Sequence, residues 1–480
     1  MRARDLATGI AAGILWLGMS CSAQGPAKYE PTIESLDKHP LPEWYAGAKL
    51  GIFIHWGLYS VPGWAPLNHP NHDFESVDYI RYNPYAEWYL NSMRVPGSPT
   101  QAYHREHFGT DTGYYDFAPI FNREVAKWDP GKMAAVFREA GAHYVVLTSK
   151  HHEGFTLWPS RVPNPSPNLK SSQLHAERDI VGELTAAVEK QGMKMGLYYS
   201  GGYDWTFNTG PIETSSDYES VKPETEAYGK YAFAQIHELI DRYHPAVLWN
   251  DIDWPKTGNA LQVEADYYNA VPDGVIDDRL GISHSDFISP EYQKLDKINP
   301  KKWEECRGLG RSFGYNRAEG EAETIAPAEL IALLVDIVSK NGNLLLDVGP
   351  EADGTIPPVQ MERLLALGAW LKQNGEAIFE TTPWTVATGM STEGDELRFT
   401  RKGDDLYVTV LGRPKGATLT IEGIAAGGGT VTLLGDPGAP LKTHAQEGKL
   451  QIVLPARLKG DYAYSIKLKG YAATGETHAR

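Results

Sequence analysis

One carboxylate, Asp251, follows an apolar run at residues 246–249, at the point where the run turns polar. Pro245 bounds the run, which indicates a buried strand. Desolvating a carboxylate is costly, so an Asp at the carboxyl end of a buried parallel strand usually has a chemical role. The competing interpretation is an Asp that caps the next helix or orders a loop. We take Asp251 as the candidate reactive carboxylate.

Further side chains able to bind or stack lie at the ends of predicted strands. They are His55, His151, His152, Tyr198 and Trp249. Because the carboxyl ends of barrel strands meet at one face, we expect these residues to gather around Asp251. Trp and His offer stacking faces and neutral hydrogen-bonding groups, which suit sugar hydroxyls. One such His alone would indicate a satisfied core residue, but three at equivalent strand ends favour a site.

Two other chemistries are open to the same residues. Three His and Asp251 could ligate zinc. However, adjacent His151 and His152 would have to turn toward one ion, which the alternation of a strand opposes. A serine hydrolase is a weaker alternative because no Gly-x-Ser-x-Gly elbow occurs. We therefore expect neither a metal nor a cofactor.

Hydrolysis of a glycoside needs a second carboxyl group beside the first. Between Asp251 and residue 305 the chain offers Asp253, Asp286, Glu291, Glu304 and Glu305. Their positions do not choose among them. We expect Asn250, Trp249 and nearby donors to stabilise the charged form of Asp251. A less polar setting and the charge of Asp251 should raise the pKa of the partner acid.

Strands and helices alternate over most of the chain. Helical stripes fall at 129–141, 179–192, 231–243, 327–338 and 357–374, with apolar strands between several of them. This pattern predicts a TIM-like (β/α) barrel whose site lies at the carboxyl ends of its strands. An open doubly wound sheet would need a Gly-rich phosphate turn after its first strand, and His55-Trp56-Gly57 is not one.

From about residue 378 the pattern changes to short alternating strands, separated by Gly, Pro and Asp. They fall at 396–400, 405–410, 418–421, 429–434, 449–454 and 462–467. Such spacing predicts a β-sandwich. The expected domains are thus a barrel over 24–377 and a sandwich over 378–480.

Residues 1–23 have the three parts of a signal peptide. Arg2 and Arg4 precede an apolar run, and Cys21-Ser22-Ala23 offers small residues for cleavage before Gln24. We expect a secreted or periplasmic protein, with lipidation of Cys21 as the less favoured alternative. The run is short for a membrane span. Removal of the signal leaves Cys306 alone, so no intrachain disulfide can form.

The composition of the chain limits the classes of molecule that it is expected to bind. Of 480 residues, 42% are hydrophobic and 22% charged, and the net charge is −16. An acidic chain repels nucleic acid and anionic lipid, so a neutral substrate fits better. Self-association into a homo-oligomer stays open.

Five motifs in order resemble the α-L-fucosidases of glycoside hydrolase family 29. They are Gly51-Ile-Phe-Ile-His-Trp-Gly57, Lys150-His-His-Glu-Gly-Phe155, Gly196-Leu-Tyr-Tyr-Ser200, Leu248-Trp-Asn-Asp251 and Ser312-Phe-Gly-Tyr-Asn316. The resemblance runs from about Trp44 to Pro350. It implies a catalytic barrel followed by a β-sandwich, and a retaining mechanism through a covalent fucosyl-enzyme. Where this family usually has Asp in the second motif, the chain has Glu153.

The resemblance also assigns roles. Asp251 matches the nucleophile, and the segment 284–292 points to Glu291 as the acid/base, with Glu304 as runner-up. The implied fucose pocket consists of His55, Glu87, Trp88, His151, His152, Tyr198, Trp249, Arg279 and Phe313. The implied substrate is a fucosylated oligosaccharide or glycoconjugate. The alternatives are an exo-glycosidase for a related sugar such as α-L-galactose, and a non-catalytic carbohydrate-binding protein.

Overall fold

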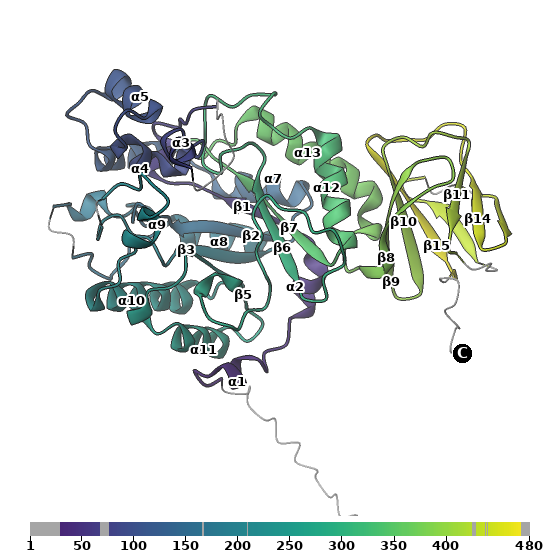
Figure 1. Cartoon of the computed structure of the whole chain (residues 1–480), viewed down its shortest axis with the longest axis horizontal. Coiled ribbons are helices and arrows are strands. Elements are labelled where there is room, and N and C mark those ends of the chain that lie inside the picture. The colour runs from purple at the N-terminus through teal and green to yellow at the C-terminus, as the bar shows by residue number, and fades with distance from the viewer. Residues whose placement is uncertain are drawn as a thin grey trace, which may run out of the picture.

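The computed structural model describes residues 29–67, 76–165, 168–208, 210–424, 429–436, 438 and 440–471. The expected signal peptide, with Cys21, lies outside these residues. A larger α/β part carries a smaller β part at one side (Figure 1). Within the described ranges, no helix is long and apolar enough to span a membrane.

One parallel sheet organises the larger part. In the described chain it has seven strands in the order β5-β4-β3-β2-β1-β7-β6. Their bounds are β1 Leu50–Ile54, β2 Tyr144–Lys150, β3 Lys194–Ser200, β4 Val247–Asp251, β5 Val275–Ile276, β6 Trp303–Gly308 and β7 Gly342–Val348. Residues 286–292 bridge the two outer strands, because Asp286 N–H donates to Ile276 O at 3.0 Å and Ile288 N–H to Lys302 O at 3.1 Å. The prediction of a (β/α) barrel is confirmed.

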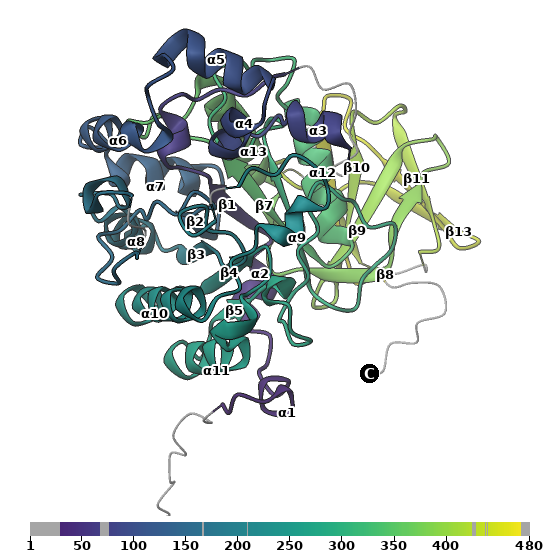
Figure 2. The ribbon, with the colours of Figure 1, turned by 60° about the vertical axis from the view of Figure 1, so that its left-hand side comes forward.

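Helices surround this sheet on its outside (Figure 2). The main ones are α7 Pro130–Glu139, α8 Ile180–Lys190, α10 Glu226–Tyr243, α11 Ala260–Ala270, α12 Pro327–Ser339 and α13 Pro358–Asn374. Shorter α-helices are α1 Ile33–Leu36, α2 Glu43–Ala48, α3 Val77–Arg81, α4 Tyr89–Arg94, α5 Pro99–Phe108, α6 Ala118–Val125 and α9 Asp217–Ser220. The 3₁₀ turns are η1 Leu58–Ser60, η2 Ala86–Trp88, η3 Tyr114–Phe117, η4 Ser171–Gln173, η5 Lys256–Gly258, η6 Asp278–Leu280 and η7 Gly375–Ala377. The longest of the helices that were not expected from the sequence are α5, α6 and α11.

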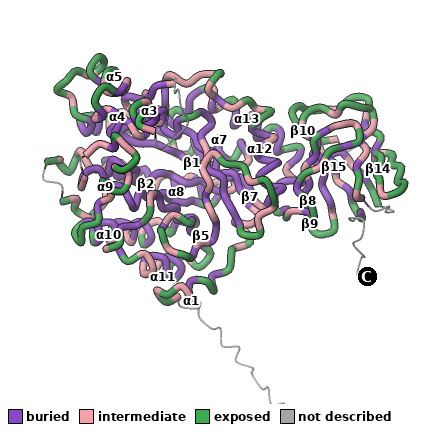
Figure 3. Tube along the Cα trace, viewed as in Figure 1, coloured by how far each residue is buried: buried purple, intermediate pink, exposed green. Residues whose placement is uncertain are grey.

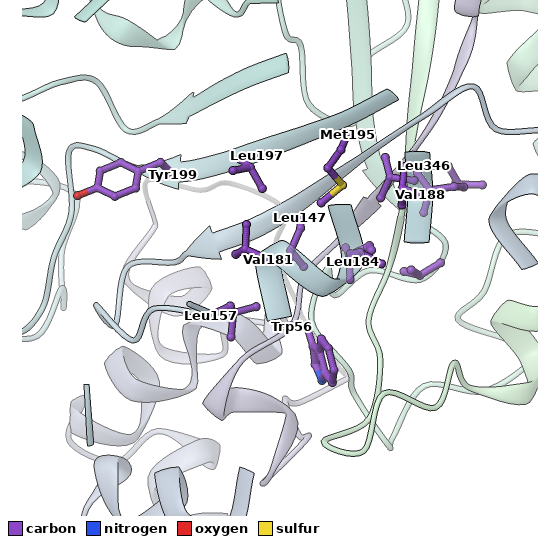
Figure 4. Close-up of a cluster of buried hydrophobic side chains, with 14 of the residues drawn as sticks. Trp56, Leu147, Leu157, Val181, Leu184, Val188, Met195, Leu197, Tyr199 and Leu346 are labelled. Atoms are coloured by element: carbon purple, nitrogen blue, oxygen red, sulfur yellow. The ribbon is translucent and has the colours of Figure 1, made fainter. Parts of the chain in front are cut away.

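Alternation along the strands divides the core into two layers. Leu147 and Leu197 face outward and pack with Val181 and Leu184 of α8 (Figure 4). The residues between them face into the barrel, where Phe53, Tyr198 and Trp249 belong to a separate cluster. The sheet is buried along most of its length (Figure 3). Because side chains alternate with a period of two, Asp251 faces the barrel side with Trp249, and Asn250 faces away.

The smaller part is a pair of antiparallel sheets, and the predicted β-sandwich is confirmed. The described strands pair in the orders β12-β15-β10-β9-β8 and β11-β14-β13. Their bounds are β8 Thr382–Met390, β9 Glu396–Lys402, β10 Asp405–Leu411, β11 Thr418–Glu422, β12 Thr430–Leu433, β13 Thr443–Gln446, β14 Lys449–Val453 and β15 Ala463–Lys469. Helix α12 lies against β8 and β9, and Arg398 Nε donates to Asp336 Oδ1 at 2.5 Å across this junction (Figure 1).

Candidate active site

Asp251 ends β4 and is buried to 8% exposure. Three donors hold its carboxylate: Tyr198 Oη reaches Oδ2 at 2.8 Å, while Arg279 Nη1 and the backbone N–H of Ile252 reach Oδ1 at 2.9 and 3.0 Å. Hydrogen bonds to the charged form favour it. Asn250 was expected to contribute and does not, because it faces away and donates to two backbone carbonyl groups.

The backbone after Asp251 is held in an unusual conformation. Ile252 and Asp253 have φ angles of +58° and +64°. This left-handed region is costly for a β-branched residue. The N–H groups of Gly201 and Gly202 both donate to Asp251 O at 3.1 Å, and a Cβ on Gly202 would lie 1.4 Å from Ile252 O. The close approach of two glycines thus fixes the turn that carries Asp251.

Hydrogen bonds on the far side of two His rings orient them. Ser200 Oγ donates to Tyr203 O at 2.8 Å, so it accepts from His152 Nδ1–H at 2.7 Å. That tautomer leaves Nε2 unprotonated, 3.8 Å from Asp251 Oδ2. Burial lowers the pKa of His152 well below 6.5, and the neighbouring His151 and His55 add to this. His152 is therefore a neutral group at neutral pH.

His55 and His151 are positioned in a similar way. His55 Nδ1 lies 2.6 Å from Asp347 Oδ1, and burial lowers the pKa of His55. His151 Nδ1 lies 3.3 Å from Glu153 Oε2. Glu153 thus reaches His151 despite its extra methylene. Behind this loop, the buried pair of Lys150 and Asp204 (3.0 Å) supports it without lining the cavity.

Glu87, Trp88 and Phe313 come from segments outside the barrel strands. Glu87 Oε2 accepts the backbone N–H of Gly314 at 2.8 Å, and burial raises the pKa of Glu87 to about 7. The ring of Trp88 meets His152 edge-on at 5.4 Å, and Phe313 lies 4.9 Å from the ring of His55. The two aromatic residues supply apolar faces within a ring of polar groups.

Arg279 joins the two candidate carboxyl groups. Its Nη1 binds Asp251, and its Nη2 lies 3.5 Å from Glu291 Oε2. Ser289 fixes the guanidinium by accepting from Nε and Nη2, and the group lies over the ring of Trp249 at 4.5 Å. Burial raises the pKa of Glu291, opposed by Arg279 and assisted by the charge of Asp251. A raised pKa is the direction predicted for the partner acid from the sequence.

The other candidate partners point elsewhere. Glu304 lies inside the barrel, where its carboxyl group accepts from Tyr45, Tyr144 and Trp249 Nε1. The indole of Trp249 is therefore bound to Glu304 and not to Asp251, so the expectation that it would stabilise Asp251 is wrong. Asp253, Asp286 and Glu305 do not line the cavity either.

All eleven residues named from the sequence line one cavity of about 210 Å³ at the carboxyl ends of the strands. They are His55, Glu87, Trp88, His151, His152, Tyr198, Trp249, Asp251, Arg279, Glu291 and Phe313. Five further residues complete the wall: Phe53, Tyr85, Tyr218, Ile252 and Cys306. Tyr85 donates to Glu291 Oε1 at 3.3 Å. Its place two residues before Glu87 is the only signal that could have found it.

Over the described residues, no group of three or more His, Cys, Asp and Glu is arranged to hold a metal ion. Two of the three His use Nδ1 for Asp347 and Ser200. The metal-independent reaction stays a prediction, to be tested with a chelator.

A barrel whose strand ends carry two carboxyl groups, neutral polar groups and aromatic faces around a small cavity defines a glycoside hydrolase. Comparisons with known proteins agree with this assignment to the glycoside hydrolases. A model of the family described as alpha-L-fucosidase matches residues 17–376. The human tissue alpha-L-fucosidase is 34% identical over 492 residues, which cover 98% of each chain. The chain belongs to the α-L-fucosidase family.

Solved structures extend this likeness to the fold. The crystal structure of the alpha-fucosidase from Thermotoga maritima is 43% identical, with a TM-score of 0.83 over 92% of this chain and 100% of that one. An alpha-L-fucosidase from Bacteroides thetaiotaomicron, trapped as a covalent intermediate, is 25% identical, with a TM-score of 0.68 over 90% and 96% of the two chains.

Proposed function

We propose that this protein is a retaining exo-α-L-fucosidase that works through a covalent fucosyl-enzyme, with Asp251 as nucleophile and Glu291 as acid/base. The carrying observation is that one guanidinium, Arg279, binds both carboxyl groups at the wall of a cavity sized for one small sugar. Asp251 has three donors that favour its charged form, while burial favours the protonated form of Glu291.

In the first step, an oxygen of Asp251 attacks the anomeric carbon as Glu291 gives its proton to the glycosidic oxygen. The glycosidic C–O bond breaks, the leaving group departs as an alcohol, and fucose becomes an ester of Asp251. In the second step Glu291 takes a proton from water. The water oxygen attacks the anomeric carbon, the ester bond breaks, and Asp251 regains its charge. Two displacements give net retention.

The fucose ring binds through neutral groups. His55, His151 and His152 offer nitrogens to its hydroxyl groups, while Trp88 and Phe313 cover its apolar face and methyl group. A site that hydrogen-bonds substrate hydroxyls discriminates strongly, because an analogue lacking them leaves buried polar groups unpaired.

The proposal also covers the substrate, the localisation and the domain boundary. The substrate is a terminal α-L-fucose on an oligosaccharide or glycoconjugate. Residues 1–23 are a signal peptide that directs the protein to the periplasm or out of the cell, and the domains divide at 377/378. Size-exclusion chromatography with light scattering will determine whether the chain forms a homo-oligomer.

The direct test uses proton NMR on an aryl α-L-fucoside. Retention requires that α-L-fucose appears first and mutarotates later, whereas β-L-fucose as the first product would refute the mechanism. Treatment with 2-fluoro-fucosyl fluoride should trap the ester, because fluorine destabilises the oxocarbenium-like transition states. Peptide mapping must then find the label on Asp251.

A panel of aryl glycosides tests the sugar specificity. Faster turnover of the α-L-galactoside than of the α-L-fucoside would contradict it. Calorimetric binding of fucose without any turnover would instead support a carbohydrate-binding protein.

A further inference from the structure

A second, larger cavity begins on the Glu291 side of the catalytic cavity. Its volume is about 1050 Å³, and it extends between α12 and the sandwich, where Arg398 and Leu411 line it. Tyr85, which donates to Glu291 Oε1, lines both cavities. Tyr292, the residue after Glu291, also lines the larger one. The two cavities therefore lie against the same side chain, Tyr85, next to the candidate acid/base.

The proposed function determines which part of a substrate would enter this junction cavity, and the inference rests on it. Glu291 must protonate the glycosidic oxygen, so the leaving group lies on the Glu291 side of the fucose ring. The catalytic cavity of about 210 Å³ has room for little beyond one sugar. Pockets of roughly 300–1000 Å³ hold drug-sized ligands, so the junction cavity can hold a leaving group of several sugars.

Charges at the far end of the junction cavity are already paired. Asp336 Oδ2 accepts from Lys340 Nζ at 2.6 Å, and Asp336 Oδ1 accepts from Arg398 Nε at 2.5 Å. Arg398 Nη2 lies a further 3.6 Å from Glu396 Oε2. This end offers a ligand few unused charged groups.

At the end of the junction cavity next to Tyr292, Arg307 has a guanidinium whose Nη donors are unused. Arg307 is half-buried over the ring of Tyr292 at 5.3 Å, and its Nε donates to Gly308 O. Within the described residues, neither of its Nη atoms has a hydrogen-bond acceptor, and no carboxylate lies within ion-pair distance of Arg307, Arg311 or Lys294. A planar guanidinium with free Nη donors fits the paired oxygens of a sulfate or carboxylate.

Acidic side chains also lie near this end of the cavity and oppose its positive charge. Asp296, Glu323 and Glu329 also line the cavity, and Glu323 Oε2 accepts the backbone N–H of Gly320 at 2.9 Å. Glu305 lies close to Arg307 and Lys294, and burial raises its pKa to about 7, so at neutral pH it carries only part of a negative charge. None of these carboxylates lies within ion-pair distance of the Arg307 guanidinium.

We propose that the natural leaving group is a glycan lying in the junction cavity, and that it carries an anionic substituent bound by the guanidinium of Arg307. Arg311 and Lys294 add positive charge beside it. The shared chemistry is a pair of anionic oxygens, from either a sulfated or a carboxylated sugar.

The test compares three fucosylated oligosaccharides that differ only in the leaving group, which is neutral, sulfated or carboxylated. At low salt, the wild-type kcat/KM should favour at least one anionic substrate over the neutral one by about tenfold. The ratio should shrink as salt rises, because exposed charges are screened. In Arg307→Gln, the ratio of kcat/KM for the anionic substrate to that for the neutral one should be close to one. Arg307→Lys keeps the charge but loses the paired Nη donors, so it should retain part of the preference for the anionic substrate.

The matched control is Arg413→Gln, which removes the same charge from an exposed residue outside both cavities. It should leave the ratio as in the wild type. Equal or better wild-type turnover of the neutral substrate would overturn the inference, as would the same ratio in Arg307→Gln and Arg413→Gln. Turnover of an aryl α-L-fucoside by the wild type tests the proposed function separately, since that substrate has no anionic leaving group.

Discussion

Replacing Tyr198 by Phe should slow the second chemical step but not the first. Tyr198 Oη donates to Asp251 Oδ2 at 2.8 Å, and its ring stacks on Trp249. Phe keeps the stacking and removes only this hydrogen bond. The bond weakens as Asp251 loses its charge to the ester, and it strengthens again as the carboxylate departs. Its loss therefore falls mainly on hydrolysis of the fucosyl-enzyme.

The expected fall in kcat follows from the strength of the one hydrogen bond that the substitution removes. A hydrogen bond to a charged group contributes about 1.5–3 kcal/mol. With the charge about half developed in the transition state, roughly 0.75–1.5 kcal/mol is lost, which is about a four- to thirteenfold fall in kcat. Arg279 and the N–H of Ile252 still hold the other oxygen, so Asp251 keeps its place.

The assay is stopped-flow and steady-state kinetics on an aryl α-L-fucoside with an activated leaving group. We expect a lower kcat, a lower KM, a kcat/KM that does not fall and a burst of aryl alcohol. Tyr199→Phe is the matched control: it removes a hydroxyl from the next residue, which faces outward and donates to Gln235 Oε1 at 2.9 Å. A fall in kcat/KM equal to that in kcat, without a burst, would refute the reasoning. Equal effects of the two variants would assign the change to packing.

Four further predictions concern single side chains. Glu291→Ala should accumulate fucosyl-enzyme from an activated aryl fucoside, and azide should restore turnover as α-fucosyl azide; azide rescue of Glu304→Gln instead would make the acid/base assignment wrong. Glu304→Gln should unfold at a lower temperature by differential scanning calorimetry, at a cost of about 1–3 kcal/mol, because an amide mismatches its three buried donors. Tyr85→Phe should move the alkaline limb of kcat/KM to higher pH: this donor favours the charged form of Glu291, so its loss raises the pKa further above 4.5, and Glu291 stays protonated longer. His152→Ala should reduce kcat/KM by about 100-fold or more, whereas His237→Ala on α10 should change it less than about twofold, and a chelator should change neither wild-type parameter.

Local sequence patterns were sufficient to predict the barrel because every strand of such a sheet must supply apolar side chains to both of its faces. An inner and an outer layer must both be filled, so apolar runs end where polar groups reach the rim. Asp251 could be singled out for this reason, and the period of two puts it on the same face as Trp249. The pattern failed in the irregular segment before β7, where β6 was not recognised as a strand.

The sequence by itself determined the barrel, the sandwich, the family resemblance and the residues gathered around Asp251. Only the tertiary structure decided which carboxyl group meets it. Glu291 and Glu304 lie 13 positions apart in an irregular segment, where spacing carries no information about direction. Closure of the barrel by residues 286–292 turns Glu291 to the cavity, while β6 turns Glu304 into the barrel interior. The same closure places one Arg279 guanidinium on both carboxyl groups, a contact set by packing between distant segments.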